Sequence, residues 1–366
     1  MKIYKVILVI LLLVTLKENI YGEENLENYL KEMKGYLKEN NIQSLDIENL
    51  SDNLLEGKGI DYTNFFEIFF KEIHKELKSY IGIFAVIFLI NLINMLSDFK
   101  GSEIRKISSI VILIIISQRI LVCYIDILKT FGKTIEILNN IMQITVPFIT
   151  ILNTLTKHIN FAKKTMPIVL LMSQATMVIA NKIIIPISTF SIILGVVTYI
   201  NENNIFKKFS KSLNKFSFSL LAIIFSIFIC ILSLEGNMAV NVDNIFLKTV
   251  KVATNTIPVV GKYVTDTLGM VTTSFSLIKS IIGTIAFVTM FFILITPIIK
   301  ITISIILLTI FENLLIQVEG EFNVSSLFNK FKDAYVLLAS VLVLTVITFT
   351  ISIGIMITIT KGWFIC

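Results

Sequence analysis

Few residues of this sequence can bind metals or carry out catalysis. Its 366 residues include three cysteines and two histidines, and neither histidine has a cysteine or carboxylate near it at the spacing of metal ligands. The cysteines are scattered in or beside apolar segments, which is typical of buried, inert thiols and not of a disulfide framework. Motifs for nucleotide binding, zinc proteases and serine hydrolases are also lacking. We therefore expect no enzyme activity, no metal and no cofactor.

Charged residues are also scarce, and their scarcity points to a membrane. They make up 16% of the chain against 55% for hydrophobic residues, and several apolar stretches approach the ~20 residues that cross a bilayer. The net charge of +6 comes mainly from lysines in short loops between these stretches. These lysines do not form the basic, aromatic-interleaved clusters of RNA-binding proteins. The sequence thus predicts an all-α polytopic membrane protein that contacts the lipid bilayer and no nucleic acid.

The N-terminal residues have the pattern of an export signal. Lys2 and Lys5 precede an apolar core at residues 6–16, and Gly22 offers a small residue for cleavage. We therefore predict that residues 1–22 are a cleaved signal peptide, with a retained short anchor as the alternative.

Residues 23–79 are predicted to form a small exported helical segment. Residues 23–80 contain 13 acidic residues against 7 lysines, which fits the outer side of the membrane. Apolar residues at helical spacing indicate an exposed amphipathic helix at Leu26, Leu30, Met33 and Leu37.

A second helix is predicted to begin near Asn64, where Glu67 completes a capping box. Its apolar face contains four phenylalanines: Phe65, Phe66, Phe69 and Phe70. This face would bind the membrane surface or a partner. Alternatively, the two helices of the segment would pack on each other as a hairpin.

The remaining residues, 80–366, are predicted to form a bundle of about 8–10 transmembrane or re-entrant helices. The apolar runs lie at 80–96, 107–124, 136–155, 166–180, 183–200 (with a tight turn at Asn181-Lys182), 216–234, 281–297, 301–316 and 334–360. Three basic loops, 98–106, 157–165 and 201–215, would then all face the cytoplasm, as the positive-inside rule requires for an outside N-terminus.

A weak internal repeat relates residues 107–205 to residues 218–316. The offset is 111 residues, and it superimposes two pairs of prolines: Pro147 on Pro258, and Pro186 on Pro297. Repeats of membrane helices are common in transport proteins. The repeat would make the polar stretch 249–272 the counterpart of the span 136–155, and so embedded or re-entrant. The alternative is a helix that lies flat on the outer surface.

Charged residues in and near this stretch form a candidate intramembrane polar site. Lys262 and Asp266 are four residues apart, so they share one face of a helix. Bare charges at bilayer depth cost at least ~2.5–3.5 kcal/mol each and normally face a cavity or one another. Pro258 and Gly261 permit a kink there. The candidate residues of this site are Lys251, Pro258, Gly261, Lys262, Asp266 and Lys279.

Arg119 is a further candidate, because it lies deep within the predicted span 107–124. Its long side chain is expected to extend to the outer membrane interface. The alternative is a structural ion pair with Asp126 or Glu136.

The segment FLKTVKVATNTIPVVGKYVTDTLGMVTTSFSLIKSIIG, residues 246–283, resembles the stage III sporulation protein AE family of endospore-forming bacteria. The specific part of the likeness is Ile-Pro-Val-x-Gly-Lys followed by Thr-Asp. The export signal, the acidic exported segment and the order of spans extend the likeness over most of the chain.

The resemblance implies a membrane subunit of the sporulation channel or feeding-tube assembly between mother cell and forespore. Members of the family reside in the mother-cell membrane, with their exported segment in the intermembrane space. Their partners are other stage III sporulation proteins, including a secretion-type ATPase and ring-forming proteins, and homo-oligomers are compatible with this role. The assembly supports forespore development and late forespore gene expression. The alternative is an independent secondary transporter or permease of unknown substrate, which the repeat and the embedded charges would also suit.

Overall fold

The computed structural model describes residues 23–40, 42, 45–56, 58, 63–96, 102–156, 159–201, 208–220, 222–228, 230–231, 260–316 and 324–358. These residues are almost all helical and include no strand, which confirms the predicted all-α class. The predicted signal peptide, residues 1–22, lies outside the described residues.

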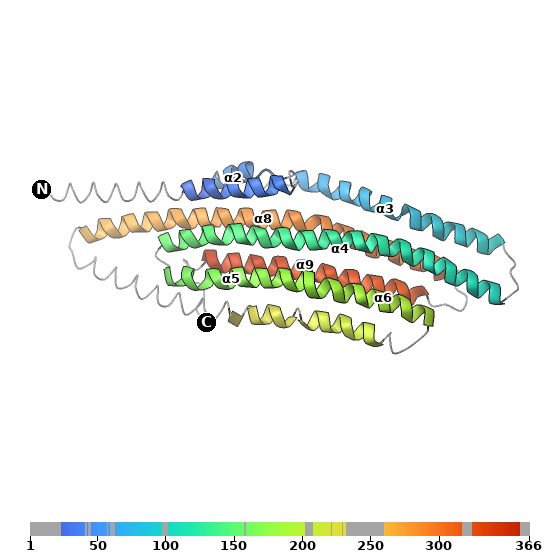
Figure 1. Ribbon diagram of the computed structural model, residues 1–366. Coiled ribbons are helices and arrows are strands. Elements are labelled where there is room, and N and C mark those ends of the chain that lie inside the picture. Colours follow the sequence, from blue (N-terminus) through green and yellow to red (C-terminus); the bar gives the residue numbers. More distant parts are fainter. Residues whose placement is uncertain are drawn as a thin grey trace.

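The helices run side by side as one elongated bundle (Figure 1). They are α2 (Ile47–Leu55), α3 (Thr63–Leu96), α4 (Ser102–Leu155), α5 (Ile159–Ile179), the π-helical η1 (Ala180–Ile184), α6 (Ile185–Asn201), α8 (Val260–Ile316) and α9 (Val324–Thr358). Residues 23–39 and most of 208–231 are also helical. Helices α4 and α8 are antiparallel, because Lys279 contacts Asn153 whereas Lys300 contacts Asp126.

Helix α4 is one unbroken helix where two spans, 107–124 and 136–155, were predicted. The charged stretch between these spans looks like a loop in the sequence. It also carries apolar residues at helical spacing, and their burial keeps the helix continuous: Ile120, Tyr124, Ile127, Phe131 and Ile135. At 1.5 Å per residue the 54 residues of α4 extend for about 80 Å, more than twice the ~30 Å of a hydrocarbon core.

Other predicted breaks are also absent from the described helices. The spans 281–297 and 301–316 form one helix, α8, with Pro297 inside it. The predicted turn at Asn181-Lys182 is the π-helical segment η1, so α5, η1 and α6 are continuous. The helix that begins at Thr63 continues through the predicted span 80–96 as α3. Within the described residues, several helices are therefore longer than predicted.

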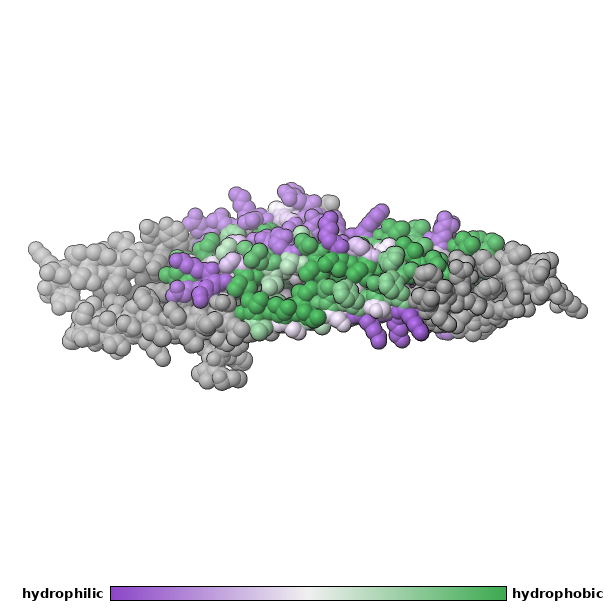
Figure 2. All heavy atoms as spheres, turned by 60° about the horizontal axis from the view of Figure 1, so that its bottom comes forward, coloured by the Kyte–Doolittle hydropathy of each residue, from purple (hydrophilic) through white to green (hydrophobic). Residues whose placement is uncertain are grey.

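Within the described residues, five helical segments are long and apolar enough to cross a membrane: Ile114–Leu155, Ala162–Val197, Lys208–Phe228, Ser276–Leu315 and Leu327–Ile357. They are the segments expected of a multi-pass membrane protein. Hydrophobic residues also cover a broad area of the surface in the middle of the molecule (Figure 2).

The continuity of α4 overturns the prediction that three basic loops share one side. Residues 102–106 begin α4, whereas residues 159–165 begin α5 at the other end of α4. Residues 102–106 and 159–165, the described parts of two of these loops, therefore lie at opposite ends of α4. The helix boundaries do not follow the 111-residue offset either. Leu155 ends α4 and Ile159 begins α5, but the equivalent positions, 266 and 270, lie inside α8.

The helix over residues 23–39 is amphipathic as predicted, but its apolar stripe is buried against the bundle. Leu26, Met33 and Leu37 belong to one core cluster with residues of α4 and α8. Tyr29, fully buried in the same stripe, lies 3.4 Å from the Thr145 hydroxyl and 3.4 Å from the Ile282 carbonyl oxygen. The helix is therefore neither free nor packed only on its neighbour α2.

The predicted phenylalanine face is divided between the core and the surface. Phe69 packs against the core, whereas Phe70 is 65% exposed. The side chains of Phe65 and Phe66 lie outside the described residues. The outer side of α3 carries a longer exposed apolar row instead: Phe70, Leu77, Ile81, Phe84 and Phe88. We refer to these five residues as the α3 row.

Candidate functional site

Helix α8 carries two buried lysines, each bonded to α4. Lys279 is fully buried and Lys300 is 5% exposed. Burial of an ammonium group in an apolar bundle is costly unless polar partners compensate it. The partners of these two lysines define the candidate site, a buried polar network along α8.

Lys300 lies at the centre of the network. Its Nζ donates to Asp126 Oδ2 at 2.8 Å and to Thr130 Oγ1 at 3.1 Å, and both acceptors are on α4. The Asp126 side chain is 63% exposed, whereas that of Lys300 is 7% exposed. The lysine therefore extends from the interior towards a carboxylate at the bundle surface, as long basic side chains commonly do.

A third charged residue reaches this region from α3. Glu76 is almost completely buried, and the Ser304 hydroxyl donates to its Oε1 at 3.4 Å. Ser304 follows Lys300 by one turn of α8, so the carboxylate lies on the same side of α8 as the lysine. Helices α3, α4 and α8 thus contribute one charged residue each: Glu76, Asp126 and Lys300.

Lys279 forms the second part of the network. Its Nζ donates to Asn153 Oδ1 on α4 at 2.9 Å. The Asn153 side-chain amide in turn donates to the Met356 carbonyl oxygen on α9 at 3.0 Å. This chain of hydrogen bonds joins α4, α8 and α9 near one end of the described bundle.

An ion pair between Lys332 and Glu312 joins α9 to the last turns of α8. Both side chains are largely buried. Helix α8 is therefore tied to its neighbours by polar contacts at three levels along its length.

Buried hydroxyl groups extend the network to α6 and α9. Tyr80 and Tyr335 hydroxyls lie 3.4 Å apart, and the Tyr124 hydroxyl lies 2.7 Å from Ser188 Oγ. Replacing Tyr124 by Phe should leave the buried Ser188 hydroxyl without this partner. We expect a loss of about 1–3 kcal/mol in the free energy of unfolding, measured by denaturation in detergent.

A double variant checks this explanation. Replacing Ser188 by Ala together with Tyr124 by Phe removes both partners, so it should cost less than Tyr124→Phe alone. An equal or larger loss in the double variant would show that the hydroxyl pair is not the cause.

Among the sequence-predicted intramembrane site residues whose side chains the structure describes, Lys279 lies in a buried polar contact. Gly261 lies in the first turn of α8, so residues 260–272 continue into the apolar part of α8 as one helix. Lys251 and Pro258 lie outside the described residues, as do the side chains of Lys262 and Asp266. Their proposed pairing stays a prediction.

Arg119 is exposed on α4, in agreement with a side chain directed to the molecular surface. Asp126, one of its suggested partners, is bonded to Lys300 instead. Sequence reasoning did not select Lys300 or Glu76, and it named Asp126 as a possible partner of Arg119 and not of Lys300. The sequence does show Lys300 as a lone lysine between two apolar runs. It does not show the partner, because Asp126 is 174 positions away.

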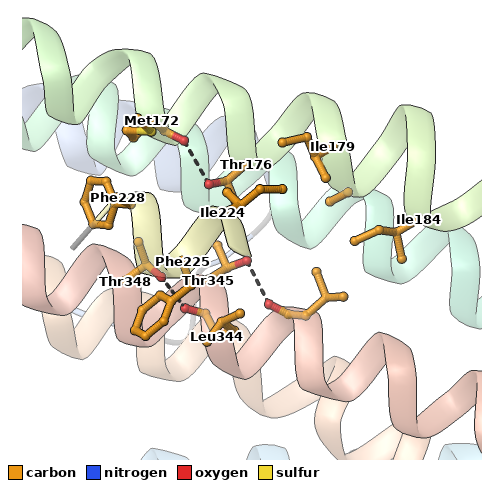
Figure 3. Close-up of a pocket in the computed structure, with 12 residues that line it drawn as sticks. Met172, Thr176, Ile179, Ile184, Ile224, Phe225, Phe228, Leu344, Thr345 and Thr348 are labelled. Atoms are coloured by element: carbon orange, nitrogen blue, oxygen red, sulfur yellow. Dashed lines mark hydrogen bonds between the residues drawn. The ribbon is translucent and has the colours of Figure 1, made fainter. Parts of the chain in front are cut away.

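A small apolar cavity lies between α5, η1, residues 224–228 and α9 (Figure 3). Its volume is about 30 Å³. The hydroxyls of Thr176, Thr345 and Thr348 line it, and each donates to a carbonyl oxygen one turn earlier in its own helix. These hydroxyls are thus already bonded and offer little to a polar ligand. In the part of the chain that the structure describes, no three His, Cys, Asp or Glu side chains gather as metal ligands.

Long apolar helices joined by buried polar pairs define a multi-pass α-helical membrane protein. Comparison with known sequences then identifies its family. Residues 49–360 match the family described as Stage III sporulation protein AE, and the chain belongs to this family. This match confirms the resemblance seen in residues 246–283.

A known relative supports the same assignment over a shorter region. The Stage III sporulation protein AE of Bacillus subtilis (strain 168) is 29% identical over 118 residues. The match spans 32% of this chain and 30% of the length of the relative. No solved structure matches the chain.

Proposed function

We propose that the chain is a membrane subunit of the channel or feeding-tube assembly between mother cell and forespore. In this role it is required for forespore development and late forespore gene expression. The observation that carries the proposal is the family match over residues 49–360, since the family is named for stage III of sporulation. The long apolar helices support a place within a membrane.

The proposed location is the mother-cell membrane that faces the forespore, with the exported segment in the intermembrane space. The proposed partners are other stage III sporulation proteins, including a secretion-type ATPase and ring-forming proteins. The α3 row supports such contacts, because a row of exposed apolar side chains is typical of a surface that binds another protein or a membrane.

Deletion of the gene in its sporulating host tests the proposal. We expect normal vegetative growth, completed engulfment and then arrest of the forespore, with loss of late forespore gene expression from a reporter. A wild-type copy should restore heat-resistant spores. Normal spore formation in the deletion strain would contradict the proposal.

A second candidate is an independent secondary transporter or permease. The buried Lys300 and Glu76, together with Asp126, the ion-pair partner of Lys300, favour it, since ionisable residues among membrane helices often mark substrate or ion pathways. A transporter of this kind predicts altered growth or solute uptake in vegetative cells. The same deletion strain therefore separates the two candidates.

A further inference from the structure

The described helical residues between 208 and 231 lie along the lower edge of the bundle, where they are drawn in yellow (Figure 1). This helix packs on α6 through two serines. The Ser210 and Ser191 hydroxyls lie 2.9 Å apart, and Ser210 Oγ also donates to the Ser191 carbonyl oxygen at 3.1 Å. Farther along the chain, residues 224–228 border the cavity beside α5 and α9. We call the first part of this helix, residues 208–220, the lysine helix.

The inward face of the lysine helix consists of small polar residues. Ser210, Asn214 and Ser217 are spaced by four and three residues, so they share one face, and all three are buried. In a helix of a soluble protein the buried face is apolar instead. Small polar residues at a helix contact are typical of membrane proteins, where they let two helices approach closely. The polarity of the lysine helix is therefore the reverse of a soluble one.

The outward face of the lysine helix carries phenylalanines. Phe209, Phe216 and Phe218 are 50%, 54% and 40% exposed. The Phe209 ring lies 6.5 Å from the exposed ring of Phe190, so the apolar surface continues onto α6. A continuous exposed apolar surface is typical of a face that meets a membrane or a protein partner.

Three lysines occupy the same outward face. Lys208, Lys211 and Lys215 are exposed and are spaced by three and four residues, so they form one row between the phenylalanines. The sequence 208–234 contains no acidic residue. Within the described residues, no ion pair includes any of the three lysines. Three positive charges are thus left for an external anion to neutralise.

The headgroup layer of a bilayer suits this combination of side chains. Aromatic rings are enriched at the membrane–water interface, and amphipathic helices at membrane surfaces combine lysines with phenylalanines. Long lysine side chains keep their ammonium groups in the polar layer while their stems cover apolar surface. A protein partner fits less well, because lysine is depleted and arginine enriched at the cores of protein–protein interfaces.

We propose that the lysine helix binds the headgroups of anionic phospholipids. The phosphate groups lie among Lys208, Lys211 and Lys215, and the phenylalanine rings lie against the upper parts of the acyl chains. Each basic residue near an anionic membrane surface strengthens binding about fivefold, whereas zwitterionic lipids offer no net charge. This binding goes beyond the proposed function and needs no sporulation partner, since the bilayer itself supplies the ligand.

Quenching of a fluorophore by labelled lipids tests the proposal. The full chain, with Cys123, Cys230 and Cys366 replaced by Ser, carries the fluorophore on Ser212→Cys, an exposed position beside the lysines. It is reconstituted into phosphatidylcholine vesicles that contain a minority of phosphatidylglycerol. A headgroup quencher is attached to one of the two lipids, at the same fraction in each case. Quenching by the labelled phosphatidylglycerol should indicate binding at least about fivefold stronger than that of labelled phosphatidylcholine.

Two triple variants identify the groups responsible. Replacing all three lysines of the lysine helix by Gln should abolish the preference for phosphatidylglycerol and leave quenching by phosphatidylcholine unchanged. The matched control replaces three exposed lysines elsewhere, Lys31→Gln, Lys38→Gln and Lys75→Gln. It removes the same total charge, and the preference should remain.

Four results would overturn the proposal. Equal quenching by the two labelled lipids would exclude selectivity for anionic headgroups. Absence of quenching by either lipid would show that water or protein covers this face. A preference that survives the loss of the three lysines, or one that the control also abolishes, would exclude a site at these lysines. The comparison of the two lipids in the chain that keeps its lysines depends on no lysine variant, and the vesicles contain no other sporulation protein.

Discussion

The Lys300→Glu variant is expected to lose about 3–5 kcal/mol of stability, because breaking a buried ion pair leaves an uncompensated charge. The new carboxylate would lie beside Asp126 and near the buried Glu76. The exposure of Asp126 to solvent reduces its share of the repulsion, so most of the loss comes from the buried charge. Thermal unfolding of the purified protein in detergent measures the loss, and spore counts in the complemented deletion strain measure its consequence.

Two matched variants separate this effect from a general intolerance of charge changes. Lys182→Glu reverses an exposed lysine on η1 and should change stability by less than about 0.5 kcal/mol. Exchange of the partners, Lys300→Asp with Asp126→Lys, should recover part of the stability. A Lys182→Glu variant as unstable as Lys300→Glu would contradict the central role of the buried lysine.

Replacing Gly283 by Leu should destabilise the contact between α8 and α9 by about 1–3 kcal/mol, the usual range for overpacking. A Cβ atom at this position would clash with Ile357 Cδ1 and would lie 3.1 Å from Ile353 Cγ2. The end of Ile357 can rotate away from a single methyl group, but a whole leucine side chain requires the two helices to separate. The midpoint of thermal unfolding in detergent reports the loss.

Gly82→Leu is the control for this variant. Gly82 is exposed on α3, and a Cβ atom there meets nothing within 4 Å. Leucine is a better helix former than glycine by about 0.8–1 kcal/mol, so this variant should be neutral or more stable. Similar losses for both leucines would show that the close approach of α8 and α9 at Gly283 is not the cause.

The sequence by itself determined the class of this protein and its family. Runs of about 20 apolar residues predict membrane-spanning helices, because a helix bonds its own backbone N–H and C=O groups where no water can do so. The spacing of Leu26, Met33 and Leu37 predicted an amphipathic helix for the same local reason, since residues three and four apart share a face. The motif in residues 246–283 identified the family, and the match over residues 49–360 confirmed it.

Only the tertiary structure decided where the helices end and which charges meet. The stretch after Arg119 has the charges of a loop, yet α4 continues through it because Tyr124 and Phe131 are buried against neighbouring helices. The local sequence shows the charges of this stretch. It does not show which helices, distant in sequence, bury the apolar residues between those charges. The pairing of Lys300 with Asp126 likewise joins residues 174 positions apart, and depends on the antiparallel packing of α4 on α8. Tertiary packing also placed the charged helix over residues 23–39 against α4 and α8, because its single apolar stripe needs the faces of these two helices to cover it.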